Sequence, residues 1–166
     1  TAAADFMAQA GVVDFVGKDE VTVLNKVREL VMMLPANNED DASYEECTDD
    51  LNRSLDNLSS ELDDVTFALK DLSDHGVFVE VKSTYAKEMV TGFIRLNGMT
   101  VGAIANRTEI VDEDGKATTK YDDVLTTAGC YKAEKFVAFC DAFNIPVLTL
   151  TNVSGYSATM NDAKSI

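Results

Sequence analysis

The chain has little histidine and cysteine, which many catalytic and metal sites require. Its one histidine, His75, lies in a polar turn without an evident partner, which disfavours a role as a general base. The three cysteines lack CxxC spacing and are odd in number, which argues against both a disulfide framework and a zinc site. Reduced thiols in a cytoplasmic protein are the simpler interpretation, and no metal site is predicted.

Long apolar runs and basic residues are also scarce. No run approaches the roughly 20 apolar residues that cross a bilayer, and no signal peptide is visible. Only 14 Lys and Arg accompany 29 Asp and Glu, and the resulting net charge of −15 disfavours nucleic acid and anionic lipid as partners. Because the chain begins with Thr1 rather than methionine, we expect a fragment of a longer protein.

The acidic residues are concentrated in one segment. Seven of the twelve residues in 39–50 are Asp or Glu, which predicts a solvated linker and places a domain boundary at about residues 36–50. A calcium site is the alternative, but the D-x-[DN]-x-[DN]-G pattern with a distal Glu is missing.

Apolar periodicity predicts the helices of the first half. A helix is expected over residues 20–34, with Asp19 as its N-cap and Pro35 ending it. Two further helical stripes occupy residues 51–62 and 65–72. Before them, the segment 11–16 is compatible with a short strand.

Asn97-Gly98 gives the clearest local prediction, because this dipeptide between two apolar runs is typical of a type I′ hairpin. A two-residue loop fixes the register. The apolar or small pairs on one face are Leu96 with Met99, Ile94 with Val101, Gly92 with Ala103, and Val90 with Ala105. A slip by one residue would place Arg95 among them, so the register is well determined. The small pairs predict that another element packs closely on this face. A half-buried strand is expected just before the hairpin, at 77–82.

The segment 132–156, KAEKFVAFCDAFNIPVLTLTNVSGY, holds the candidate site. A polar surface loop at 112–123 precedes a helix that starts near Gly129. The β-branched run 147–151 then predicts a buried parallel strand. Ligands of open α/β folds gather beyond the carboxyl ends of such strands.

Gly155 and Tyr156, just beyond that strand, are therefore candidate site residues. A glycine lets the main chain approach a ligand, and free N–H groups there can face a developing oxyanion. An ordinary strand-to-loop turn is the alternative. Lys132, near the start of the preceding helix, is a candidate partner for a phosphate or carboxylate, with a merely solvated lysine as its alternative. No GxGxxG, P-loop or GxSxG motif is present, and Ser154-Gly155 lacks the partners of a serine hydrolase.

These segments resemble the carboxyltransferase subunits of biotin-dependent acyl-CoA carboxylases and decarboxylases of the propionyl-CoA and methylmalonyl-CoA type. The family pattern is a Lys-Ala helix, FCDAFNIP, a strand, and Asp-x-Pro-Gly-Phe, for which this chain has NVSGY. Upstream, FVEVKSTYAKEMVTGFIRLNGMTVGAIAN is similar to the family's V-x-G-x-x-R-x-x-G-x-x-V-G-x-x-A-N. AGVVDFVGKDE and MLPANN resemble the end of the family's first half. The resemblance covers most of residues 8–156, in the family's order.

The resemblance implies an α/β fold that is a partial crotonase-like unit with a β-hairpin and a helix-strand unit. Residues 1–35 would be the tail of the first half, 36–50 the linker, and 51–166 the start of the second half. The implied reaction moves a carboxyl group between carboxybiotin, on a partner carrier protein, and the α-carbon of an acyl-CoA. Backbone N–H pairs would hold the enolate, so no nucleophilic side chain is needed.

The resemblance also assigns roles within this chain. Gly155 and Tyr156, with Lys132, would line the biotin side of the site, while the main oxyanion-hole residues are expected outside this chain. The isolated chain is therefore expected to be inactive, and the parent protein to be a cytoplasmic homo-oligomer. Two alternatives are a non-catalytic crotonase-like scaffold or assembly domain, and an interaction module in which residues 39–50 bind a partner.

Overall fold

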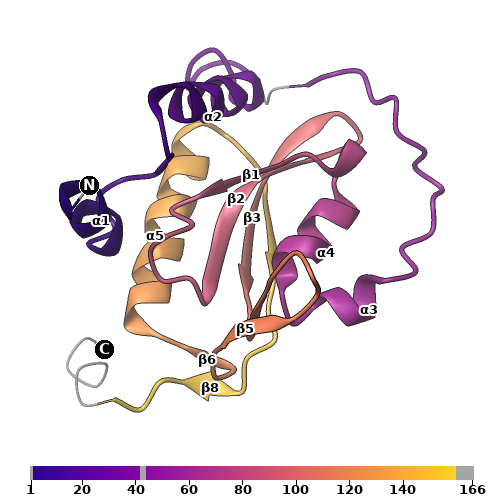
Figure 1. Ribbon diagram of the computed structural model, residues 1–166. Coiled ribbons are helices and arrows are strands. Elements are labelled where there is room, and N and C mark those ends of the chain that lie inside the picture. The colour runs from indigo at the N-terminus through magenta and orange to yellow at the C-terminus, as the bar shows by residue number, and fades with distance from the viewer. Residues whose placement is uncertain (1, 42–43, 160–166) are drawn as a thin grey trace.

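The computed structural model describes residues 2–41 and 44–159, and its centre is a four-stranded sheet in the order β1-β2-β3-β7 (Figure 1). Neighbouring strands are antiparallel except β3 and β7, which are parallel. The strands of this sheet are β1 (Phe78–Val81), β2 (Met89–Leu96), β3 (Met99–Asn106) and β7 (Val147–Leu150). Two smaller sheets pair β4 (Glu109–Val111) with β5 (Ala117–Lys120) and β6 (Val124–Leu125) with β8 (Gly155–Tyr156).

The helices lie around this sheet, with α5 on one side and α4 on the other (Figure 1). They are α1 (Ala2–Gln9), α2 (Glu20–Met33), α3 (Leu58–Glu61), α4 (Val65–Leu72) and α5 (Thr127–Ala142), with a 3₁₀ turn η1 (Asp74–Gly76) after α4. The prediction of α2 is confirmed at both ends. Asp19 accepts a hydrogen bond from the backbone N–H of Thr22 at 2.7 Å, and Leu34, before Pro35, is already extended. None of the helices in the described ranges is long and apolar enough to cross a membrane.

The Asn97-Gly98 hairpin has the predicted register, including all four apolar or small pairs. Both turn residues have positive φ, 50° at Asn97 and 82° at Gly98, as a type I′ turn requires. The element that packs on the small pairs is α4. Its residues Val65, Ala68 and Leu69 form one core cluster with Val90, Ala103 and Ala105.

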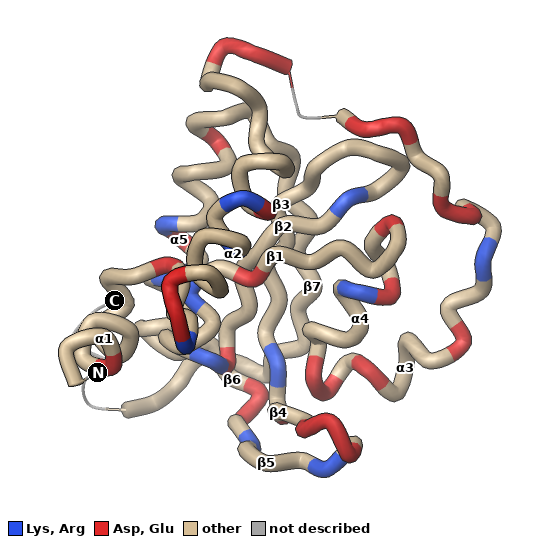
Figure 2. The backbone as a smooth tube through the Cα atoms, turned by 45° about the horizontal axis from the view of Figure 1, so that its top comes forward, with Lys and Arg blue, Asp and Glu red and all other residues tan. Residues whose placement is uncertain are grey.

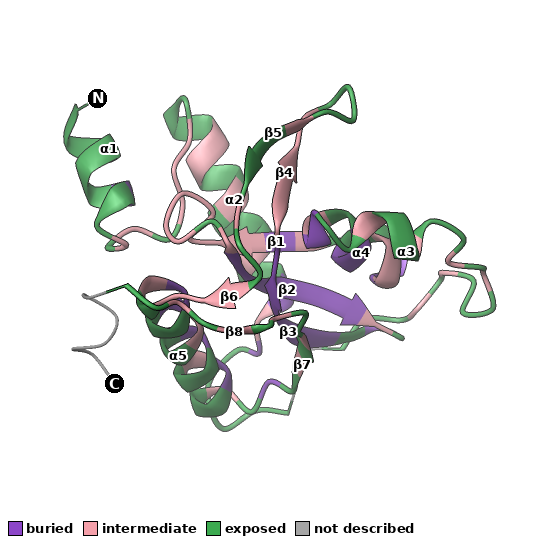
Figure 3. Cartoon of the chain, turned by 90° about the horizontal axis from the view of Figure 1, so that it is seen from below, coloured by how far each residue is buried: buried purple, intermediate pink, exposed green. Residues whose placement is uncertain are grey.

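A second core lies on the opposite face of the sheet, because successive side chains of a strand point to opposite sides. There Phe136 and Cys140 of α5 pack on Phe93 and Ile104, and Met33 of α2 joins the same cluster. Figure 3 shows that β2 and β3 are the most buried elements, whereas α1 is almost wholly exposed. Two covered faces explain why the central hairpin is nearly apolar throughout.

Three sequence predictions are corrected. The segment 11–16 is not a strand. It begins as a turn after α1, in which Val12 N–H donates to Met7 O at 3.1 Å. The segment then accepts a single backbone hydrogen bond, from Lys82 N–H to Asp14 O, and forms no strand pairing. The stripe at 51–62 forms only the short α3, because aspartate oxygens before it bind nearby backbone N–H groups, as in Asn52 N–H to Asp50. The predicted loop at 112–123 contains strand β5 and the turn that joins it to β4, which lies just before the loop.

The acidic segment runs around the outside of the molecule, and Figure 2 shows its acidic residues spaced along that path. Several contacts hold it against the hairpin and η1. The N–H of Glu45 donates to Gly98 O at 2.8 Å, and Tyr44 forms an isolated bridge with Met99. Further along, Thr48 Oγ1 lies 2.7 Å from His75 Nε2. The division of the chain at residues 36–50 stays a prediction.

Candidate functional site

Gly155 and Tyr156 lie in β8, beyond the carboxyl end of β7. The prediction of a parallel strand there is confirmed, but β7 is the edge strand of the described sheet and is only half-buried, with Val147 39% exposed. A β-carbon added at Gly155 would have no atom within 4 Å, and Tyr156 is 71% exposed. The main chain at this turn is therefore open to a ligand.

The turn between β7 and β8 is held from two sides. Asn106, which ends β3, exchanges two hydrogen bonds with the backbone of Asn152, at 2.7 and 2.8 Å. Ser154 N–H donates to Asp123 O at 2.7 Å, and Ser157 N–H donates to Leu125 O at 2.8 Å. These bonds fix the backbone on either side of Gly155, so the turn is preorganised although its side chains are exposed.

The pairing of β8 with β6 brings the turn next to the start of α5. Thr126 follows β6 directly and caps the helix by accepting a hydrogen bond from Gly129 N–H at 2.9 Å. The same hydroxyl donates to Glu88 Oε1 at 2.6 Å. The helix thus begins at Thr127, two residues before the predicted Gly129. Neither β6 nor its parallel pairing with β8 was predicted, because a two-residue strand has no periodicity.

Lys132 is turned away from solvent. It is 1% exposed, and its Nζ donates to the carbonyl oxygens of Tyr85 at 2.7 Å and Ala86 at 3.3 Å. The structure therefore brings Lys132 to the loop between β1 and β2, rather than to the open turn at Gly155. Burial lowers the pKa of Lys132 to about 8, because lost hydration outweighs the favourable charges of Glu80 and Glu88.

Lys132 belongs to a group of buried charges that the sequence patterns did not reveal. Arg107 is 7% exposed and Asp64 is 4% exposed, and Nη1 of the arginine lies 3.3 Å from Oδ1 of the aspartate. Arg107 Nε also donates to Lys87 O at 2.6 Å. Asp64 further accepts from the backbone N–H of Val111 at 3.0 Å. This pair joins α4 to the ends of β3 and β4.

Glu80 completes the group. Its Oε1 is buried and makes no hydrogen bond within the described residues. Burial raises the pKa of Glu80, and the positive charges of Arg107 and Lys132 oppose that rise only in part. Glu80 lies within the strand that was predicted at 77–82, but only the folded structure shows which basic residues lie near it.

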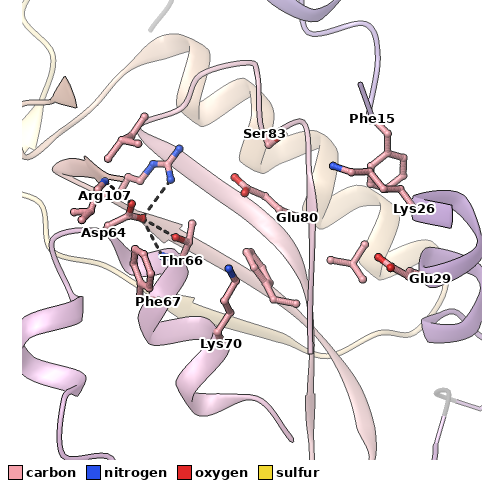
Figure 4. A pocket seen from close by; sticks show the side chains of 14 residues that line it. Phe15, Lys26, Glu29, Asp64, Thr66, Phe67, Lys70, Glu80, Ser83 and Arg107 are labelled. Carbon is pink, nitrogen blue, oxygen red and sulfur yellow. Dashed lines mark hydrogen bonds and ion pairs between the residues drawn. The ribbon is translucent and has the colours of Figure 1, made fainter. Parts of the chain in front are cut away.

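A cavity of about 460 Å³ opens beside Glu80 and Arg107 (Figure 4). Phe67 and Lys70 of α4 line one part of it, and Lys26 of α2 lines another. The cavity thus combines aromatic surface with charges of both signs. In residues 2–41 and 44–159, no group of three or more His, Cys, Asp and Glu side chains is placed to hold a metal ion.

A family model, curated relatives and solved structures all match nearly the whole chain, and all three kinds of match are to carboxyl transferase proteins. The family model described as "Carboxyl transferase domain" matches residues 1–165. The propionyl-CoA carboxylase beta chain of Roseobacter denitrificans is 37% identical over 161 residues, and methylmalonyl-CoA decarboxylase subunit alpha of Propionigenium modestum is 31% identical over 160. Each match covers 89% of this chain and 28% of the relative, so this chain spans under a third of their length. The crystal structure of transcarboxylase 12S with hydrolysed methylmalonyl-coenzyme A superposes with a TM-score of 0.82 and 30% identity, covering 98% of this chain and 31% of that one.

Proposed function

Because this chain belongs to the carboxyl transferase domain family and has its crotonase-like α/β fold, we propose that its parent protein moves a carboxyl group between carboxybiotin and the α-carbon of an acyl-CoA. The observation that carries this proposal is the match of fold and sequence along nearly the whole chain to transcarboxylase 12S, whose structure holds a methylmalonyl-coenzyme A product. The relatives are carboxylases, decarboxylases and carboxyltransferases, and this range leaves the direction of transfer and the acyl chain open.

We place the biotin side of the site at Gly155 and Tyr156. When bound, carboxybiotin supplies the activated carboxyl group. The open space at Gly155 suits a flat ring that approaches the main chain, and the exposed Tyr156 ring offers an apolar wall. The hydrogen bonds of Asn106 to Asn152 keep this backbone in place as the ligand binds. Main-chain groups that are held in place in this way can stabilise a developing negative charge, so the proposed reaction needs no nucleophilic side chain.

Lys132 acts on this site indirectly in our proposal. Its ammonium is engaged by the carbonyls of Tyr85 and Ala86, so it fixes the loop between β1 and β2 against the first turns of α5. Glu88, in the same loop, binds the cap residue Thr126. The loop therefore sets the position of the start of α5, which follows β6. Strand β6 pairs with β8, which holds Gly155.

The proposed partners follow from the reaction. A carrier protein presents the biotin, and acyl-CoA is the second substrate, with further oxyanion-hole residues outside this chain. Transcarboxylase 12S is described as a hexamer, which supports a homo-oligomer here as well. We expect the protein to act in the cytoplasm and the isolated chain to be inactive.

The test is Tyr156→Ala in the full-length protein, with Tyr131→Ala as control because Tyr131 is an exposed tyrosine of α5. If biotin covers roughly 55 Å² of the Tyr156 ring, its loss costs about 1.4 kcal/mol, or about tenfold in the KM for biotin. The dissociation constant for acyl-CoA should stay unchanged in both variants. Steady-state kinetics with free biotin and acyl-CoA titrations measure the two quantities.

Equal weakening of biotin use and acyl-CoA binding by Tyr156→Ala would refute the placement of the biotin side. If the full-length protein transfers no carboxyl group to any acyl-CoA of two to six acyl carbons, the alternative of a non-catalytic scaffold is preferred.

A further inference from the structure

Arg95 is a buried cation that does not belong to the site described above. It is the residue before the last of β2, and its side chain is 9% exposed. One guanidinium nitrogen, Nη2, donates to Met32 O at the end of α2 at 2.9 Å, and Nη1 pairs with the carboxylate of Glu45. Because Nη2 is held by Met32 O, Nη1 is the nitrogen that pairs with a carboxylate, through a charge-assisted hydrogen bond.

Arg95 lines a cavity of about 370 Å³ between α2 and β1. This volume is within the range of small-molecule pockets. The cavity walls are mainly apolar and include Met32, Val77 and Phe78. A buried cation beside an apolar hollow is the arrangement that recognises a carboxylate with a hydrocarbon body, since the two parts of such a ligand need different surroundings.

Glu45 and Arg95 differ sharply in how firmly they are held. The Glu45 side chain is 67% exposed, and Arg95 is almost wholly covered. The backbone of Glu45 is anchored separately, by its N–H bond to Gly98 O and by the neighbouring bridge of Tyr44 to Met99. The carboxylate can therefore swing into solvent while the acidic segment stays in place. A pair with one solvated partner is weak, so a ligand can replace it.

We propose that the cavity at Arg95 binds a monocarboxylate with an apolar body, and that the Glu45 carboxylate occupies the ligand's place in its absence. The ligand carboxylate pairs with Arg95, and its hydrocarbon part lies against Val77 and Phe78. Glu29 also lines the cavity, so a second negative charge on the ligand is disfavoured. This site is independent of the proposed carboxyl transfer, and its test does not use that reaction.

The experiment titrates hexanoate into the full-length protein and follows binding by ligand-observed NMR. Glu45→Gln removes the internal competitor, and Glu46→Gln is the matched control, because it removes the same charge from the next residue. We expect Glu45→Gln to bind hexanoate about fivefold more tightly than wild type or Glu46→Gln, because an ion pair whose carboxylate is solvated contributes up to about 1 kcal/mol. Adipate should bind more weakly than hexanoate, and hexanol should not bind measurably at this cavity.

Arg95→Met should abolish the gain when combined with Glu45→Gln, and thermal melting shows whether that variant is folded. If it is not, the comparison of Glu45→Gln with Glu46→Gln decides alone. Equal affinity in these two variants, no binding in either, or equal binding of hexanol and hexanoate overturns the proposal. Each of these results would mean that Glu45 is only a structural tie between the acidic segment and β2.

Discussion

Lys132→Met is expected to change how the stability of the protein depends on pH. Lys132 is buried among charged groups, with Glu80 and Glu88 on the acidic side and Arg107 and Lys82 on the basic side. The lysine keeps its charge at neutral pH at the expense of lost hydration. Methionine has a similar volume and no charge, so it removes this penalty together with the hydrogen bonds to Tyr85 and Ala86.

The sign of the effect follows from the two pKa values of Lys132. Its ordinary value, which applies to the unfolded chain, is 10.5, and the folded value is about 8. Between these values the unfolded chain binds one more proton than the folded one, so the stability of wild type rises with pH. At 1.36 kcal/mol for each pKa unit, the full rise is roughly 3 kcal/mol. At neutral pH, Lys132→Met removes the cost of burying the charge, which stabilises the variant. It also removes one or two hydrogen bonds, which costs about 1–3 kcal/mol, so the two effects nearly cancel.

We therefore expect Lys132→Met to have nearly wild-type stability at pH 7 and to be less stable than wild type by about 2–3 kcal/mol at pH 10. Urea unfolding at pH 7, 8, 9 and 10 measures the difference, and groups that titrate equally in both proteins cancel. Lys135→Met, at an exposed position on the same helix, controls for the loss of one lysine. A stability difference that stays flat, or that shrinks above pH 8, would refute a buried and charged Lys132.

Two further predictions concern packing and the acidic segment. Gly92→Val should lower the free energy of unfolding by about 1–3 kcal/mol, because an added β-carbon would lie 2.6 Å from Val79 O and 2.7 Å from the Phe78 ring. Thermal melting measures it, and an unchanged melting temperature would mean that the sheet can open there. Limited proteolysis with mass spectrometry should find the first cut within residues 36–50, and a first cut inside the Asn97-Gly98 hairpin would contradict the boundary.

The elements that the sequence predicted well are those with local causes. The hairpin depends on Asn97-Gly98 and on the alternation of its two arms, and both are visible in a single run of residues. The start of α2 depends on Asp19 and its end on Pro35. In each case the residues that decide the structure lie within a few positions of one another, so no tertiary information is needed.

The elements that were missed or misplaced depend on contacts between distant segments. β6 exists because β8 lies beside it, about thirty residues later in the chain. The helical stripe at 51–62 looked continuous, but aspartate side chains before Arg53 divert the backbone into turns.

The candidate site shows the same division. The position of Gly155 beyond a parallel strand was predicted, because the order of helix, strand and glycine is a local pattern. The partners of Lys132 could not be predicted, since Tyr85 and Ala86 lie 47 and 46 positions away.

Gly98 illustrates why a correct local prediction can still miss a tertiary role. Its φ of 82° is what the type I′ turn demands, and the sequence pattern explains the glycine fully on that ground. In the folded chain a β-carbon at Gly98 would also lie 1.9 Å from Glu45 O, so the acidic segment could not make its bond to the turn. Asparagine tolerates positive φ, and Gly98→Asn would satisfy the turn while blocking that approach. The two requirements are therefore independent, and the second holds Glu45 within reach of Arg95.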